Sequence, residues 1–109
     1  MNSPVTQRPR ARLDLLEQFV YFGEQDSVEL GDRYLTAINA TCLRLVEHPH
    51  SGVVYDSGIA RLQGLRRVPV KGFEHYLVFY LPQQQAGIDV IRVLHGARDI
   101  DNVFARDEA

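Results

Sequence analysis

The chain has one cysteine, one lysine and no tryptophan. A single cysteine cannot form an internal disulfide, which is typical of proteins from a reducing cytoplasm, and Cys42 falls on the apolar side of a predicted helix. The longest apolar run, Tyr76 to Leu81, is far too short to cross a membrane. The first ten residues lack the apolar stretch of a secretory signal. These absences predict a cytoplasmic protein without a membrane segment.

Several kinds of site are also missing from the sequence. No glycine pattern for binding nucleotide phosphates and no nucleophile elbow is present. The four histidines, at positions 48, 50, 75 and 95, belong to no Cys/His cluster with the spacing of a zinc site. We therefore expect neither a metal ion nor a cofactor.

Charge is divided unevenly along the chain. Between Ala11 and Ala60 three arginines accompany eight acidic residues, whereas between Arg61 and Arg98 six basic residues accompany two acids. Eleven of the twelve basic residues are arginine, whose planar fork suits phosphate and carboxylate groups. The basic half of the chain is expected to contact something anionic.

The acidic half has the spacing of two helices. Apolar residues recur at helical intervals over residues 11–22, and Gly23 is expected to end this helix. A second apolar stripe covers residues 30–45, and Asp26 with Glu29 resembles a capping box at its start. The pattern predicts an edge strand and an antiparallel helix hairpin, over residues 5–8, 9–23 and 27–48.

The basic half is predicted to form an antiparallel sheet over residues 65–95. Its strands are expected at residues 65–70, 76–81 and 88–95, with a further short strand considered at 59–62. Asp99 is expected to cap a helical turn that continues to Phe104. Residues 1–109 are therefore predicted to form one α+β domain, with the helix hairpin packed on a small antiparallel sheet of three to four strands and a short C-terminal helical turn.

The predicted strand at 76–81 is apolar on both faces. Its residues alternate between Tyr76, Val78 and Tyr80 on one face and Leu77, Phe79 and Leu81 on the other. The helix hairpin can cover only one face, so the other needs the C-terminal tail, a second copy of the chain or a partner. We favour a partner, because the tail after Asp99 has few large apolar groups.

Six side chains of the sheet region are candidates for contact with an anionic target, namely Arg66, Arg67, Lys71, Arg92, His95 and Arg98. Arg66 and Arg67 are adjacent on a strand and should point to opposite faces. Arg92 alternates with apolar residues, so it either forms a structural ion pair with an acid of the helices or projects toward phosphate or an acidic surface. His95 is either a satisfied histidine at a strand end or a general acid–base group.

These residues also carry a family resemblance. The runs LRRVPV, YLVFY and GIDVIRVLHGARDI, together with a Pro-x-Ala-x-x-Asp-Leu element at Pro9, Ala11, Asp14 and Leu15, resemble the ParE branch of the RelE/ParE superfamily. The resemblance covers roughly residues 8–104, and RVLHGARD is its most specific part. Members are the toxins of bacterial type II toxin–antitoxin pairs. The resemblance implies a helix hairpin on an antiparallel sheet and a cognate ParD-like antitoxin, with a ribbon-helix-helix DNA-binding domain, whose C-terminal segment wraps the toxin.

The superfamily implies two possible activities. ParE-like members inhibit DNA gyrase and block replication, whereas RelE-like members cleave mRNA in the ribosome. No residue after Arg98 can transfer protons near neutral pH, and Phe104 lies where a RelE-type tyrosine would be expected. We therefore expect a non-catalytic gyrase inhibitor that acts through the six candidate residues. The alternative is a ribosome-dependent endoribonuclease that uses His95, Arg66 and Arg98.

The antitoxin is expected to bind the face of Tyr76, Val78 and Tyr80. Through the antitoxin, the pair would contact operator DNA indirectly. A third possibility is an inactive member that serves only as the antitoxin's partner in operator binding, in which case expression of the chain alone would be harmless.

Overall fold

The structure is a computed structural model, and it describes residues 3–107. In chain order the elements are β1 (Val5–Gln7), α1 (Pro9–Gln25), α2 (Val28–Glu47), β2 (Val53–Val54), a 3₁₀ turn (Ala60–Leu62), β3 (Arg66–Val70), β4 (Phe73–Pro82), β5 (Ile88–His95) and α3 (Ile100–Asp107). The strand order is β1-β5-β4-β3-β2, with β1 parallel to β5 and the other neighbours antiparallel. The predicted α+β class is confirmed, but the sheet has five strands rather than three or four.

The sequence predicted the ends of the helices and the short strand at residues 59–62 only in part. Helix α1 continues past Gly23 to Gln25. Gly23 does not adopt the positive φ with which a glycine typically ends a helix. Helix α2 is capped by Ser27, whose hydroxyl accepts a backbone N–H at 3.1 Å, and not by a box of Asp26 and Glu29. Residues 60–62 form the 3₁₀ turn rather than a strand.

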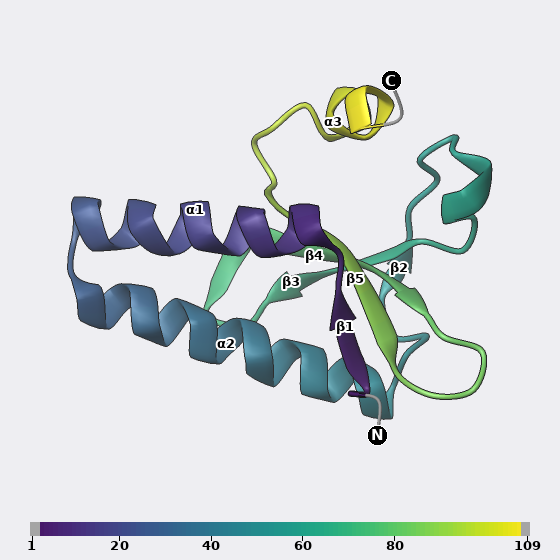
Figure 1. Ribbon diagram of the computed structural model, residues 1–109, viewed down its shortest axis with the longest axis horizontal. Helices are drawn as coiled ribbons and strands as arrows, with labels where there is room; N and C mark the ends of the chain where they lie inside the picture. Colours follow the sequence, from purple (N-terminus) through teal and green to yellow (C-terminus); the bar gives the residue numbers. More distant parts are fainter. Residues whose placement is uncertain (1–2, 108–109) are drawn as a thin grey trace.

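The helix hairpin of α1 and α2 covers one face of the sheet (Figure 1). The core between the two layers contains Tyr34 and Ile38 from α2 and Val93 from β5. Val78 and Tyr80 of β4 belong to the same core, and both are 0% exposed. The proposed antitoxin face was therefore wrong for these two residues, because the chain's own helices occupy it; Tyr76 is half-buried beside them.

The other face of the sheet is covered by the C-terminal helix α3 and the segment around the 3₁₀ turn, which lie on the side away from the hairpin (Figure 1). Phe104 of α3 packs edge-on against Phe79 of β4, with ring centroids 5.2 Å apart, and Tyr55 packs against both. Leu62 and Leu65 complete this second core. Of the three coverings considered from the sequence, the structure shows the C-terminal tail, together with the loop. The preference for a partner over the tail was wrong, because the tail and the loop together supply the apolar groups.

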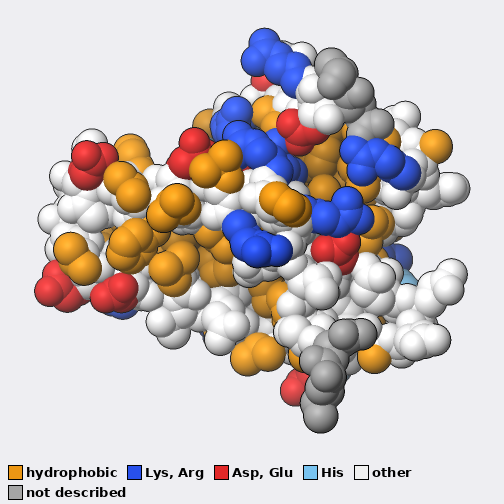
Figure 2. All heavy atoms as spheres, viewed as in Figure 1, with side chains coloured by type: hydrophobic (Ala, Val, Ile, Leu, Met, Phe, Trp, Pro, Cys, Tyr) orange, Lys and Arg blue, Asp and Glu red, His pale blue; other side chains and the backbone are white. Residues whose placement is uncertain are grey.

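Not every apolar side chain is covered. Leu13, Leu16 and Val20 follow one another at helical spacing on α1, and their exposed fractions lie between 44% and 58%. Hydrophobic side chains gather over the hairpin on the face shown in Figure 2. Among residues 3–107, none of the helices combines the length and the apolar character that a membrane crossing requires. The outward side of α1 thus carries an apolar stripe, consisting of Leu13, Leu16 and Val20, that residues 3–107 leave about half exposed.

Candidate functional site

The basic residues predicted to bind a target do not form one cluster. Arg66 pairs with Tyr80 across β3 and β4, whereas His95 pairs with Tyr76 across β5 and β4. The two positions are four residues apart along β4, which corresponds to about 13 Å, and they lie on strands separated by β4. The structure therefore does not bring Arg66 together with His95, as the nuclease alternative requires.

At one end of the sheet, Arg66 and Arg67 have structural contacts. The guanidinium of Arg66 donates to the backbone oxygens of His50 and Gly52, at 3.1 and 2.7 Å. Arg67 lies over the ring of Tyr55, 5.7 Å from its centroid, on the opposite face. The expected division of the two arginines between faces is consistent with these contacts, which also hold the loop before β2 and the second core.

At the other end of the sheet, His95 lies in an aromatic setting. Its ring stacks on that of His75, with centroids 5.8 Å apart, and meets Tyr76 edge-on at 4.9 Å. Its Nδ1 accepts the backbone N–H of Ala97 at 3.0 Å. The accepting nitrogen carries no proton in this arrangement, so a neutral His95 holds its proton on Nε2. Lys71 is exposed in the β3–β4 turn at this same end of the sheet.

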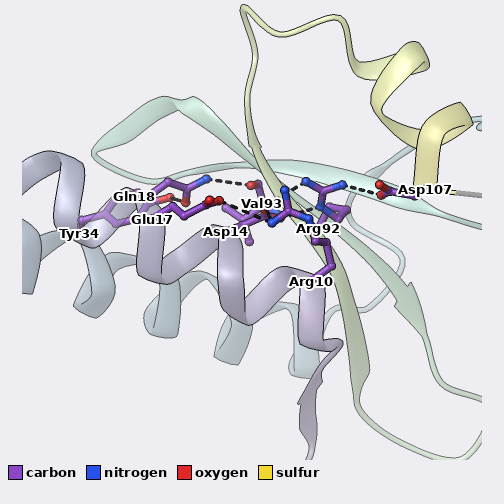
Figure 3. Close-up of polar contacts among 8 residues, drawn as sticks. All are labelled: Arg10, Asp14, Glu17, Gln18, Tyr34, Arg92, Val93 and Asp107. Atoms are coloured by element: carbon purple, nitrogen blue, oxygen red, sulfur yellow. Dashed lines mark hydrogen bonds and ion pairs between the residues drawn. The ribbon is translucent and has the colours of Figure 1, made fainter.

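Arg92 is not available to a target, because it is 2% exposed and bonded on all sides (Figure 3). Its Nε and one terminal nitrogen donate to the two oxygens of Asp14, at 2.7 and 2.9 Å. Its other terminal nitrogen donates to Asp107 of α3 at 2.5 Å. Of the two roles considered from the sequence, the structural ion pair is correct and the exposed role was wrong. Arg92 ties α1, β5 and α3 together.

Sequence reasoning missed the role of Asp14, which seals part of the sheet edge. Strand β1 pairs only with the first part of β5, and beyond Val90 the edge of β5 faces α1. There Asp14 accepts the backbone N–H of Val93 at 3.1 Å, and Gln18 donates to the carbonyl of Val93 at 2.8 Å. The i, i+4 spacing on α1 presents both side chains to one residue of the strand (Figure 3). Two side chains thus replace the missing neighbouring strand.

The ion pairs of the buried network favour the charged form of Arg92. Burial alone lowers the pKa of Arg92, but its hydrogen bonds and ion pairs with Asp14 and Asp107 outweigh burial and raise the pKa overall. Arg92 therefore stays charged. In the second core, burial and a hydrogen bond to Asp101 raise the pKa of Tyr55 to about 12, so its hydroxyl stays protonated and acts as a donor. Neither group is poised to transfer protons near neutral pH.

A pocket of about 270 Å³ opens where the start of α1 meets α3 and the 3₁₀ turn. Arginines and apolar side chains share its lining, and Arg8 and Arg10 stand at its rim. On the face shown in Figure 2, several Lys and Arg side chains gather in this region, with hydrophobic and acidic side chains between them. Within residues 3–107, no three His, Cys, Asp or Glu side chains come together as metal ligands would.

Comparison with known proteins adds a family to this geometry. The family described as "ParE toxin of type II toxin-antitoxin system, parDE" matches residues 5–100, most of the chain. Among solved structures, a chain of the "Chromosomal ParDE TA system from P. aeruginosa" superposes with a TM-score of 0.67 at 13% identity, covering 84% of this chain and 92% of that chain. At this identity the likeness is one of fold. No curated protein matches the chain.

Proposed function

Because the chain belongs to the ParE toxins of type II toxin–antitoxin systems, we propose that it inhibits DNA gyrase in the cytoplasm, blocks replication, and is neutralised by a cognate ParD-like antitoxin. The family match over residues 5–100 carries this proposal. The antitoxin would bring a ribbon-helix-helix domain, so that the toxin reaches operator DNA only through it.

A non-catalytic mode of action is supported by the placement of the candidate groups. Cleavage of RNA by attack of its 2′-hydroxyl needs a proton acceptor, a proton donor and cations around one phosphate. Here Arg66 lies about 13 Å from His95 along β4. Arg92 is buried in ion pairs with Asp14 and Asp107. A toxin that works by binding needs no such convergence.

The target would be contacted by the basic residues that remain accessible. Lys71 and Arg98 are exposed, while Arg67 and His95 are partly exposed. Arg66 is also partly exposed but holds the loop at Gly52, so its contribution to target binding is smaller. An acidic surface of gyrase, or the gyrase–DNA complex, fits the charge of these groups.

The antitoxin would bind the apolar stripe of α1 instead of the face of β4. Leu13, Leu16 and Val20 are exposed large apolar side chains at helical spacing, which suits an amphipathic partner helix. The core residues Val78 and Tyr80 cannot contact the antitoxin, because the hairpin covers them.

The test compares two double variants in gyrase supercoiling and DNA cleavage assays with purified proteins. Arg67→Ala with Arg98→Ala should abolish inhibition and the accumulation of linear DNA. The matched control, Arg33→Ala with Arg44→Ala, removes two exposed arginines from α2 and should leave inhibition intact. Circular dichroism checks that both variants fold. If the wild type leaves gyrase unaffected, or if the folded Arg67/Arg98 variant inhibits as the wild type does, the assignment fails.

A further inference from the structure

The pocket beside the start of α1 has an apolar floor. Leu62, Ile91 and Phe104 are each at most 7% exposed, and with Ile59 they line its base. Its volume of about 270 Å³ falls just below the range of about 300–1,000 Å³ that is typical of sites for whole small molecules. The space therefore suits one large apolar side chain better than a nucleotide or a cofactor.

The rim of the same pocket is basic. Arg8 bonds Asp89 through Nε at 2.6 Å, and Arg10 bonds Asp14 through one terminal nitrogen at 3.2 Å. The arginine side chains are 43% and 42% exposed, whereas the carboxylates behind them are 13% and 2% exposed. A guanidinium has five N–H donors, so each arginine keeps donors for a ligand. Two carboxylates also meet solvent here, since Glu17 lies 3.5 Å from Arg10 and Asp107, which is paired with Arg92, lines the pocket. The lining itself still has four arginines, at positions 8, 10, 61 and 92, against the one carboxylate of Asp107.

We propose that this pocket is the anchor site for an acidic segment of the antitoxin. One large apolar side chain of that segment enters the pocket, and a flanking carboxylate binds Arg8 and Arg10. This inference rests on the proposed function, since it names the part of the partner that the toxin recognises. A nucleic-acid phosphate would satisfy the rim alone and would leave the apolar floor without a partner, so the floor and rim together favour a peptide.

The position of the pocket supports the same occupant. Leu13, the first residue of the apolar stripe, follows Arg10 by one turn of α1. A partner helix that packs on the stripe would therefore bring its chain to the pocket at the N-terminal end of α1. In Figure 2 the hydrophobic side chains over the hairpin continue toward the region where Lys and Arg side chains gather.

Short peptides test the pocket independently of the antitoxin. The acetylated, amidated tripeptide Glu-Leu-Glu should shift the methyl resonances of Ile59, Leu62 and Ile91 in the full-length protein, with a Kd of about a millimolar. Lys-Leu-Lys and Glu-Ala-Glu should each bind at least about tenfold more weakly, because one lacks the charge and the other the apolar group. Equal binding of the lysine peptide, or shifts confined to other surfaces, would overturn the assignment.

The purified antitoxin then tests the partner. Arg8→Gln with Arg10→Gln should raise its Kd at least about tenfold, whereas Arg33→Gln with Arg44→Gln should leave it unchanged. The fold should survive, because Asp89 keeps its bond to Thr6 and Asp14 keeps its bonds to Arg92. If the Arg8→Gln/Arg10→Gln variant binds the antitoxin as tightly as the wild type does, the pocket is not an anchor site for the antitoxin. The proposed function is not affected by that result. Failure of the wild type to bind antitoxin, with peptide binding intact, contradicts the proposed partner and not the pocket.

Discussion

The buried carboxylate of Asp14 offers the strongest test of how this fold is held together. Its oxygens accept two bonds from Arg92 and one from the backbone of Val93, and Asp14 is 2% exposed. Asp14→Ala would leave a buried guanidinium with only Asp107 and would leave the Val93 N–H without an acceptor. Removing one partner of a buried ion pair typically costs about 3–5 kcal/mol. This is a large part of the stability of an ordinary domain.

Urea unfolding followed by far-ultraviolet circular dichroism measures the effect. With a denaturant slope of about 1.5 kcal/mol/M, a loss of about 4 kcal/mol lowers the midpoint by about 2.7 M. The control is Asp32→Ala, which removes an exposed acid of α2 and should change stability by at most about 0.5 kcal/mol. If both variants lower the midpoint equally, the buried network does not hold the fold as described here.

A double variant separates the ion pair from simple packing. Asp14→Leu combined with Arg92→Met removes both charges and leaves apolar groups in their place, so it should be more stable than Asp14→Ala alone. If the loss in unfolding free energy of the double variant instead equals the sum of the losses in Asp14→Leu and Arg92→Met alone, the two side chains are not coupled. Desolvation of an unpaired Arg92 would then not be the cause of the loss in Asp14→Ala.

Two further predictions concern single positions in the core and in a turn. Burial raises the pKa of the Cys42 thiol from 9.0 to about 11. The unfolded thiol therefore ionises first, and the unfolding free energy should fall between pH 9 and pH 11 by on the order of 2–3 kcal/mol relative to Cys42→Ala, with no difference in slope below pH 9. Gly87 has a φ of +91°, and an added Cβ would lie 2.2 Å from the backbone oxygen of Pro4. Gly87→Ala should therefore cost at least about 2 kcal/mol more than Gly58→Ala, which has a similar φ of +77° in open space, and equal melting temperatures would contradict this.

The sequence predicted the elements whose signal is periodic and local. The two helices and the strands of the basic half follow from the spacing of their own apolar residues. Strand β2 could not be found in this way, because Val53–Val54 is only two residues long and exists through its pairing with β3. The parallel pairing of β1 with β5 joins residues more than 80 positions apart, so no local pattern indicates it. The second core was missed because its apolar groups come from four separate segments, namely the loop with the 3₁₀ turn, β4, β5 and α3.

The site was harder to predict, because charge along a sequence does not reveal exposure. The position of Arg92 in an apolar row left two roles open, an ion pair with an acid of the helices or contact with a target, because an unpaired buried charge is costly. The row could not show which acid pairs with Arg92, since Asp14 lies 78 residues away in the sequence. Arg8 and Arg10, which border the pocket, lie outside the basic half altogether.

The two sides of α1 separate folding from recognition. Asp14 and Gln18 face β5 and complete its edge, whereas Leu13 and Leu16 lie on the outward side and are 44% and 58% exposed. Substitutions on the first side should reduce the amount of folded protein, and so reduce toxicity and antitoxin binding together. Substitutions on the second should leave the fold and toxicity intact and weaken only antitoxin binding. Loss of toxicity at Asp14 or Arg92 would therefore report on the scaffold, and only a folded variant that has lost one of the two activities identifies a contact residue.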